Sequence, residues 1–80
     1  MDIKIYSTPT CPYCKMAKQY ISSKGVSYQD FDVSGDAEAR EEMVKISGQM
    51  GVPVIIIDGE IIIGFDRSRI DELLNIQEEE

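Results

Sequence analysis

The sequence contains no histidine and no tryptophan, and its only two cysteines are Cys11 and Cys14. Without histidine there is no Cys-His dyad and no histidine metal ligand, so any chemistry must use thiols, carboxylates, lysines and backbone dipoles. Two cysteines three positions apart enclose almost no loop, so a disulfide between them constrains the unfolded chain very little. The cysteines are therefore predicted to be chemical groups and not a structural framework.

Long apolar runs are also absent, because the longest, residues 52–57, is far too short to span a bilayer. The first residues show no basic segment followed by an apolar one, so we find no secretory signal. We therefore expect a cytoplasmic protein in a reducing compartment, with no membrane partner. The net charge of −7 argues against nucleic acid as a partner. That charge either favours a partner with a basic docking face or serves solubility.

The 80 residues are enough for one small domain over 1–80, which we expect to be a monomer. Apolar periodicity and turn residues predict strands over residues 2–7, 26–32, 54–57 and 61–63, and helices over 12–24, from 36 to about 48, and after Asp66. The Asp58-Gly59 pair between two apolar runs is typical of a tight hairpin. An opening strand-helix-strand unit normally has parallel strands. The sequence thus predicts an α/β fold in the order β-α-β-α-β-β-α.

Met16, Tyr20 and Met43 are predicted to be core residues, because they have the spacing of core positions on their helices. The hairpin strands are almost uniformly apolar, which is typical of strands that are covered on more than one side. The helices of this chain, however, are expected to cover the hairpin only in part.

The Cys11-Pro12-Tyr13-Cys14 segment lies where the first predicted strand gives way to the first helix. Pro12 has the φ of a first helical turn and no N–H to leave unpaired, so the helix begins at or beside Cys11. The free N–H groups and the dipole of that helix end favour a thiolate at Cys11. One turn further on, Cys14 can reach the Cys11 sulfur and resolve a mixed disulfide. Tyr13 is predicted to be exposed between them, as part of a docking surface.

The neighbouring Lys15 and Lys18 have two interpretations: they raise the positive potential around Cys11, or they form the solvated face of the helix. The cysteine pair also has alternatives, namely buried structural thiols or half of a metal site. A metal site needs more ligands than this chain offers, although two thiolates and outside thiols can hold an iron–sulfur cluster between subunits. A metal- or cluster-binding module is therefore the alternative function, and we expect no resident metal.

These features resemble the glutaredoxins, a family of the thioredoxin-fold superfamily. The resemblance covers nearly the whole chain and rests on Cys11-Pro12-Tyr13-Cys14, Ser22-Ser23-Lys24-Gly25-Val26, Arg40-Glu41-Glu42-Met43, Val52-Pro53, Asp58-Gly59 and Gly64-Phe65-Asp66. It implies a thioredoxin-like fold, with a four-stranded mixed sheet flanked by three helices. It also implies a thiol–disulfide oxidoreductase that reduces protein disulfides or glutathione mixed disulfides through Cys11 and Cys14. Disulfide-containing proteins are then the expected partners, with no bound cofactor.

The resemblance implies a substrate site around the cysteines. Pro53 matches a cis-proline that sits against the cysteine pair, and the backbone of Val52 pairs with an extended substrate. Gly64, Phe65 and Asp66 match the loop and helix start that bind the γ-glutamyl part of glutathione. A strand end followed by a helix cap is the alternative interpretation of those three residues. Gln49 lies near another glutathione-contact position.

Three residues depart from the pattern of the family. Thr8 stands where glutaredoxins commonly have a lysine that binds a glutathione carboxylate. Ile63 and Phe65 replace a glycine and a small polar residue. Loss of one charge-assisted contact costs about 1.5 to 3 kcal/mol of binding free energy. The electron source is therefore either glutathione or a flavoprotein reductase. Glutaredoxin-like proteins that donate electrons to ribonucleotide reductase take them from such a flavoprotein.

Overall fold

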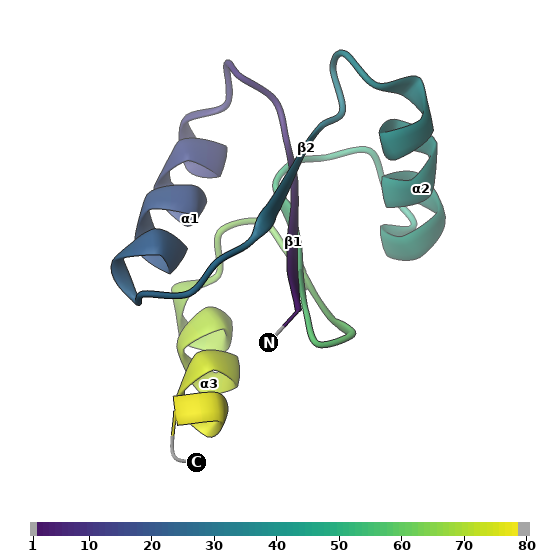
Figure 1. Ribbon diagram of the computed structural model, residues 1–80. Helices are drawn as coiled ribbons and strands as arrows, with labels where there is room; N and C mark the ends of the chain where they lie inside the picture. Colours follow the sequence, from purple (N-terminus) through teal and green to yellow (C-terminus); the bar gives the residue numbers. More distant parts are fainter. Residues whose placement is uncertain (1, 79–80) are drawn as a thin grey trace.

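The computed structural model describes residues 2–78 and has the predicted order of elements (Figure 1). The elements are β1 (Ile3–Ser7), α1 (Pro12–Ser23), β2 (Gln29–Asp32), α2 (Ala37–Ser47), β3 (Val54–Ile57), β4 (Glu60–Ile63) and α3 (Arg67–Glu78). β2 is shorter than predicted, because Val26 and Tyr28 precede it as irregular backbone while their side chains pack against the core. Within the described residues, no helix is long and apolar enough to cross a membrane.

The four strands form one mixed sheet in the order β2-β1-β3-β4. β1 and β2 are parallel, as the strand-helix-strand opening predicts, and the other neighbours are antiparallel. The β3–β4 hairpin turns at Asp58 and Gly59, whose φ values of 49° and 89° are both left-handed. A two-residue turn of this kind matches the twist of the flanking strands, and the Asp-Gly pair supplies it at low cost. The sequence signal for this hairpin is therefore confirmed.

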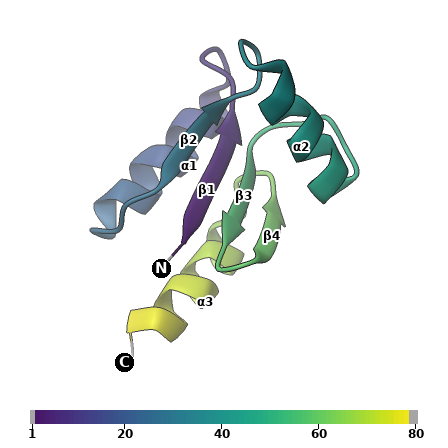
Figure 2. The same cartoon turned by 45° about the vertical axis from the view of Figure 1, so that its right-hand side comes forward.

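Helices cover the sheet on both faces, with α1 and α3 on one side and α2 on the other (Figures 1 and 2). The larger core lies under α1 and α3. Its fully or nearly buried members are Ile3, Ile5, Ala17, Ile21, Ile55, Ile57, Ile62, Ile70 and Leu74. A smaller core lies under α2 and contains Tyr6, Val33, Ala39, Met43 and Val54. The alternation of strand side chains between these two cores fixes the register of the sheet.

Residues at the helix ends explain where α2 begins and ends and where α3 begins. The Asp36 carboxylate accepts hydrogen bonds from the backbone N–H groups of Glu38 and Ala39, so it caps α2. α2 ends at Gly48, whose φ of 76° is left-handed. The Asp66 carboxylate accepts from the Arg69 N–H at 3.2 Å, in the first turn of α3. Asp66 therefore caps the N-terminus of α3.

One expectation about burial is wrong. Met16 is 46% exposed, because α1 packs against the sheet through Cys14, Ala17 and Ile21 and turns Met16 to the side. The outer strand of the hairpin is only partly covered, as expected: Ile61 and Ile63 are 42% and 53% exposed. The reason is topological, since β4 is the edge strand, whereas α2 packs over β1 and β2. Met43 is buried as predicted, and Tyr20 is half-buried.

Candidate active site

Three loops meet at one end of the sheet and bring the predicted site residues together (Figure 2). Tyr6 pairs with Val54, and Val54 pairs with Ile63, so the end of β1, the start of β3 and the end of β4 are adjacent. The loops of residues 8–11, 49–53 and 64–66 leave the sheet there. The Gly64 N–H donates to the Pro53 carbonyl oxygen at 2.8 Å and ties two of these loops together.

Cys11 is the N-cap of α1, with extended backbone angles (φ −94°, ψ 113°) and Pro12 as the first helical residue. Its Sγ atom accepts a hydrogen bond from the Cys14 backbone N–H at 3.3 Å. The side chain is half-buried, so the sulfur stays within reach of another molecule. An N–H donor and the positive end of a helix dipole both stabilise a thiolate at such a position. The predicted helix start at Cys11 is confirmed.

Cys14 has the opposite environment, because its side chain is fully buried against the sheet. Burial raises the pKa of the Cys14 thiol to about 11, and the hydrogen bond and charge interaction with Cys11 add to the increase. A hydrogen bond from the Thr8 backbone and the positive charge of Lys18 act in the opposite direction. Cys14 is thus a thiol that is shielded from solvent and lies one helical turn from the accessible Cys11 sulfur.

This difference predicts selective labelling of the reduced protein. At pH 7.5, iodoacetamide should modify Cys11 and leave Cys14 unmodified, as read by tandem mass spectrometry of the peptide that contains both. The raised pKa of Cys14 also makes the stability of the reduced fold depend on pH. The contribution is fully present below the ordinary thiol pKa of about 9 and is lost as the pH rises through about 11. Cys14→Ser should label to the same extent as the wild type. Equal labelling of both cysteines at pH 7.5 would contradict this arrangement.

A polar network behind the cysteines was missed by the sequence analysis. Lys18 Nζ lies 2.8 Å from Asp30 Oδ2, and the Ser7 hydroxyl donates to Asp30 Oδ1 at 2.9 Å. Ser7 is buried. Lys18 is therefore an ion-pair partner, whereas Lys15 is exposed on the solvated face of α1. The parallel pairing of β1 with β2 aligns Ser7 with Asp32 and Ile5 with Asp30, and only that register could have revealed the network.

The substrate residues implied by the resemblance are partly gathered at this end of the sheet. The Val52–Pro53 peptide bond is cis, as expected, and Pro53 is buried. Tyr13 is 62% exposed, which confirms its predicted position at the surface. The Gln49 amide nitrogen donates to the Gly51 carbonyl oxygen at 3.4 Å. Phe65 instead packs on α1, where its ring meets the Tyr20 ring edge-on at 5.9 Å between centroids.

No three cysteine, aspartate or glutamate side chains come together in a metal-binding arrangement anywhere in the part of the chain that the structure describes. A metal or cluster at Cys11 and Cys14 would need ligands from another molecule.

The sequence profile of the glutaredoxin family matches residues 3–62. This chain belongs to the glutaredoxin family. The glutaredoxin is 56% identical, over 72 residues, to an uncharacterised glutaredoxin-like 8.6 kDa protein of the rubredoxin operon of Clostridium pasteurianum. That match covers 90% of this chain and 96% of the relative. This chain is also 51% identical over 65 residues to glutaredoxin 3 of Escherichia coli K12, and the match covers 81% of this chain and 78% of the relative.

Among solved structures, the glutaredoxin is similar to NrdH-redoxin of Escherichia coli, with a TM-score of 0.80 and 27% identity. The match covers 91% of this chain and 95% of the other. NrdH-redoxin is described as a glutaredoxin-like protein with a thioredoxin-like activity profile. The predicted thioredoxin-like fold is thus confirmed. The vicinal pair Cys11 and Cys14 is consistent with a thiol–disulfide oxidoreductase.

Proposed function

We propose that this glutaredoxin reduces protein disulfides and glutathione mixed disulfides by dithiol exchange. The Cys11 thiolate attacks one sulfur of the substrate, forms a mixed disulfide and releases the other sulfur, which takes up a proton. Cys14 then gives up its proton and attacks the Cys11 sulfur, which frees the second substrate thiol. Two electrons pass to the substrate, and a Cys11–Cys14 disulfide remains to be re-reduced.

The contrast between the two thiols carries this proposal. Cys11 is half-buried, caps a helix and receives the Cys14 N–H on its sulfur, whereas Cys14 is buried with its pKa raised to about 11. An accessible sulfur at a helix N-terminus is suited to attack, and a protected thiol one turn away is suited to resolution. Because the Cys14 sulfur is fully buried and the Cys11 sulfur is accessible, Cys11 is the attacking group.

The substrate chain lies along the loops beside Cys11 in this proposal. The backbone of Val52, before the cis-Pro53, pairs with an extended segment, and the exposed Tyr13 ring forms one wall. Gly64 is held against Pro53 by its N–H···O bond, so the two loops form one continuous surface. These contacts support a site for a substrate chain in extended form beside Cys11, whose thiolate attacks the disulfide of that chain.

Glutathione is the proposed reductant, with weakened binding. Thr8 lacks the positive charge that a carboxylate of glutathione would meet, and the Gln49 amide is already bonded to Gly51. Phe65 packs on Tyr20. The groups left to bind the γ-glutamyl part are the Asp66 carboxylate and the backbone N–H groups of Phe65 and Asp66, because the Gly64 N–H is bonded to Pro53.

The proposal is tested by re-reduction of the oxidised protein, followed as NADPH consumption. One assay contains glutathione and glutathione reductase, and the other contains thioredoxin reductase. We expect turnover with glutathione at a high KM. Turnover with the flavoprotein alone would overturn the glutathione route. If neither assay shows turnover and the purified protein absorbs visible light and contains iron, the thiols form a cluster module instead.

The Thr8→Lys variant should restore a missing contact. One charge-assisted hydrogen bond to a glutathione carboxylate is worth about 1.5 to 3 kcal/mol, so the KM for glutathione should fall about tenfold or more. Thr8→Ala is the matched control and should leave the KM near that of the wild type. Activity with thioredoxin reductase should be unchanged in both variants. If Thr8→Lys and Thr8→Ala have the same KM, the missing lysine is not what weakens glutathione binding.

A further inference from the structure

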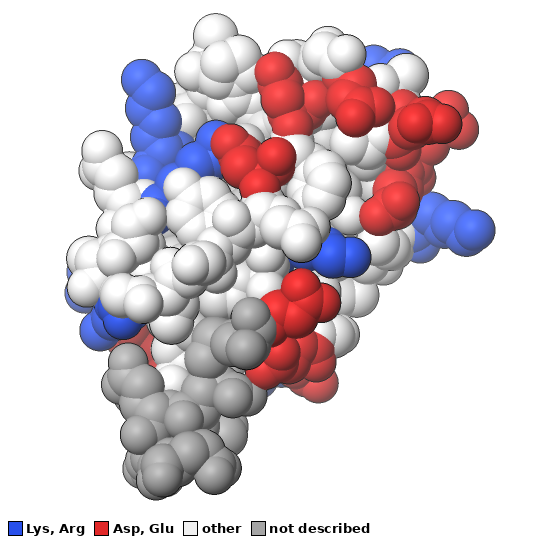
Figure 3. Space-filling model, viewed as in Figure 1, with Lys and Arg blue, Asp and Glu red and all other residues white. Residues whose placement is uncertain are grey.

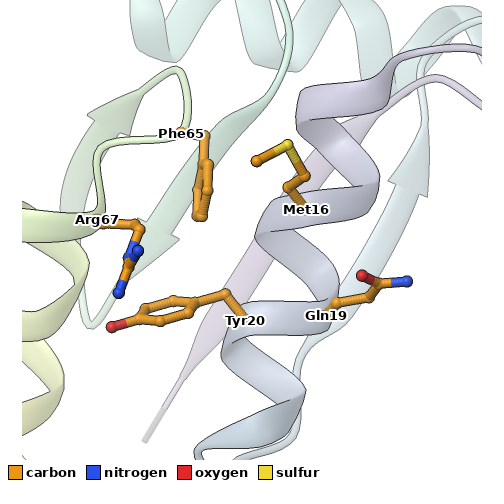
Figure 4. A pocket seen from close by; sticks show the side chains of 5 residues that line it. All are labelled: Met16, Gln19, Tyr20, Phe65 and Arg67. Atoms are coloured by element: carbon orange, nitrogen blue, oxygen red, sulfur yellow. The ribbon is translucent and has the colours of Figure 1, made fainter.

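A groove of about 340 Å³ lies between α1 and the start of α3 (Figure 4). We call it the Tyr20 groove, and it is lined by Met16, Gln19, Tyr20, Phe65 and Arg67. Met16 and Phe65 face each other at one end, and the ring of Tyr20 lies with the Arg67 guanidinium at the other (Figure 4). Three of its five residues are apolar or aromatic, so it offers a surface for a side chain of similar character.

The position of the groove links it to the reacting sulfur. Met16 follows Cys11 by five residues on α1, which is about 7.5 Å along a helix axis. Phe65 follows Gly64, whose N–H is bonded to Pro53. The Met16 and Phe65 end therefore borders the end of the sheet where the three loops of the site converge. A protein whose disulfide engages Cys11 has flanking residues within reach of the groove.

The groove also presents the positive charge of Arg67. The Arg67 guanidinium carbon lies 5.0 Å from the centroid of the Tyr20 ring. Among the side chains that the structure describes, no carboxylate forms a salt bridge with Arg67, whereas Arg69 is paired with both Glu60 and Glu72. Asp71, the acidic group nearest the ring, is hydrogen-bonded by the Tyr20 hydroxyl and lies 4.0 Å from Lys24 Nζ.

Charge is distributed so that an anionic segment is favoured on this side. α1 carries no acidic residue, and its Lys15 is exposed, whereas its Lys18 is paired with Asp30. α2, on the opposite face of the sheet, carries Glu38, Glu41 and Glu42, and red acidic side chains gather there in the space-filling view (Figure 3). In a chain of net charge −7, an acidic partner is repelled by the α2 side and meets the exposed Lys15 on α1.

We propose that the Tyr20 groove selects protein disulfide substrates that carry an apolar side chain next to a carboxylate, close to the reacting cysteine. The apolar side chain packs between Met16, Phe65 and the ring of Tyr20. The carboxylate pairs with the Arg67 guanidinium, which suits two parallel N–H···O bonds. This inference rests on the proposed function, because the groove acts on substrates that Cys11 attacks.

The test uses synthetic peptides with one cysteine, linked by a disulfide to nitrothiobenzoate, whose release is followed by absorbance. A Leu-Glu pair is moved along the peptide on both sides of the cysteine, and each peptide has a Leu-Gln counterpart. At one placement, we expect kcat/KM for the Glu peptide to exceed that of its Gln counterpart about tenfold, as a charge-assisted bond allows. Arg67→Gln should remove this preference, and Arg67→Glu should transfer it to a Leu-Lys peptide.

Arg40→Gln, an equal change of charge on the exposed side of α2, is the matched control and should keep the preference. Equal rates for Glu and Gln peptides at every placement would overturn the proposal. So would an Arg67→Gln variant that slows every peptide and the small substrate hydroxyethyl disulfide alike. If Arg67→Gln slows only turnover with a flavoprotein reductase, the groove serves that enzyme and not substrates. Failure of the wild type to reduce hydroxyethyl disulfide would instead reject the proposed function itself.

Discussion

Replacing Cys11 by serine is expected to abolish disulfide reduction, lowering kcat/KM at least about a thousandfold for every disulfide substrate. Cys11 holds the accessible sulfur, at the N-terminus of α1, and a serine hydroxyl there is not ionised and does not attack a disulfide. Cys14 cannot replace it, because its thiol is fully buried and has its pKa raised to about 11. The measurement is NADPH consumption with hydroxyethyl disulfide and with a disulfide-containing protein.

The partner substitution, Cys14→Ser, should separate the two kinds of substrate. Reduction of protein disulfides should be lost, because the mixed disulfide on Cys11 has no resolving thiol. Removal of glutathione from glutathionylated substrates should continue, since free glutathione resolves the Cys11–glutathione disulfide. Serine is smaller and more polar than cysteine at this buried position, so thermal unfolding of each variant controls for folding. Full activity of Cys11→Ser would show that Cys11 is not the nucleophile.

Local chemistry made most of the fold predictable. Pro12 after Cys11 marks the start of α1, and Asp58-Gly59 fixes the hairpin, because each of these residues favours one backbone geometry in any context. The remaining features depend on which elements become neighbours. Ile61 and Ile63 are apolar like the other hairpin residues, yet they are exposed because β4 is the edge of the sheet. No periodicity within β4 contains that information.

The active site was likewise predictable where it depends on local sequence and not where it depends on packing. The helix-capping position of Cys11 was predictable from four consecutive residues, but the burial that raises the pKa of Cys14 arises only in the folded packing of α1. The link of Ser7 to Lys18 through Asp30 joins three elements and appears only when the parallel register is known. Phe65 lies in the loop that the resemblance assigns to glutathione, but its ring contacts the Tyr20 ring of α1, which sequence position alone does not reveal.

The other large effect is expected for stability, from Ile55→Ala in the central strand β3. Ile55 is fully buried, lies opposite Ile5 and Ile62 in the neighbouring strands, and belongs to the larger core. Loss of its side chain leaves a cavity that the surrounding strands fill poorly, at a cost of about 2 to 5 kcal/mol. A chain of this length is stabilised by only about 4 to 12 kcal/mol in total, and the expected fall in the midpoint of thermal unfolding is about 10 to 30 °C.

Ile61→Ala is the matched control, because it deletes the same atoms from a side chain that is 42% exposed on the edge strand β4. Its expected cost is below about 1 kcal/mol. Both variants are compared by urea unfolding in the reduced state, so that the disulfide between Cys11 and Cys14 does not contribute. Equal costs for the two variants would contradict the described sheet order, which places β3 inside and β4 at the edge. β3 begins directly after Pro53 of the substrate site, so unfolding of this strand should also destroy the site. At the temperature where Ile55→Ala is half unfolded, that variant should have lost activity, whereas Ile61→Ala should be as active as the wild type.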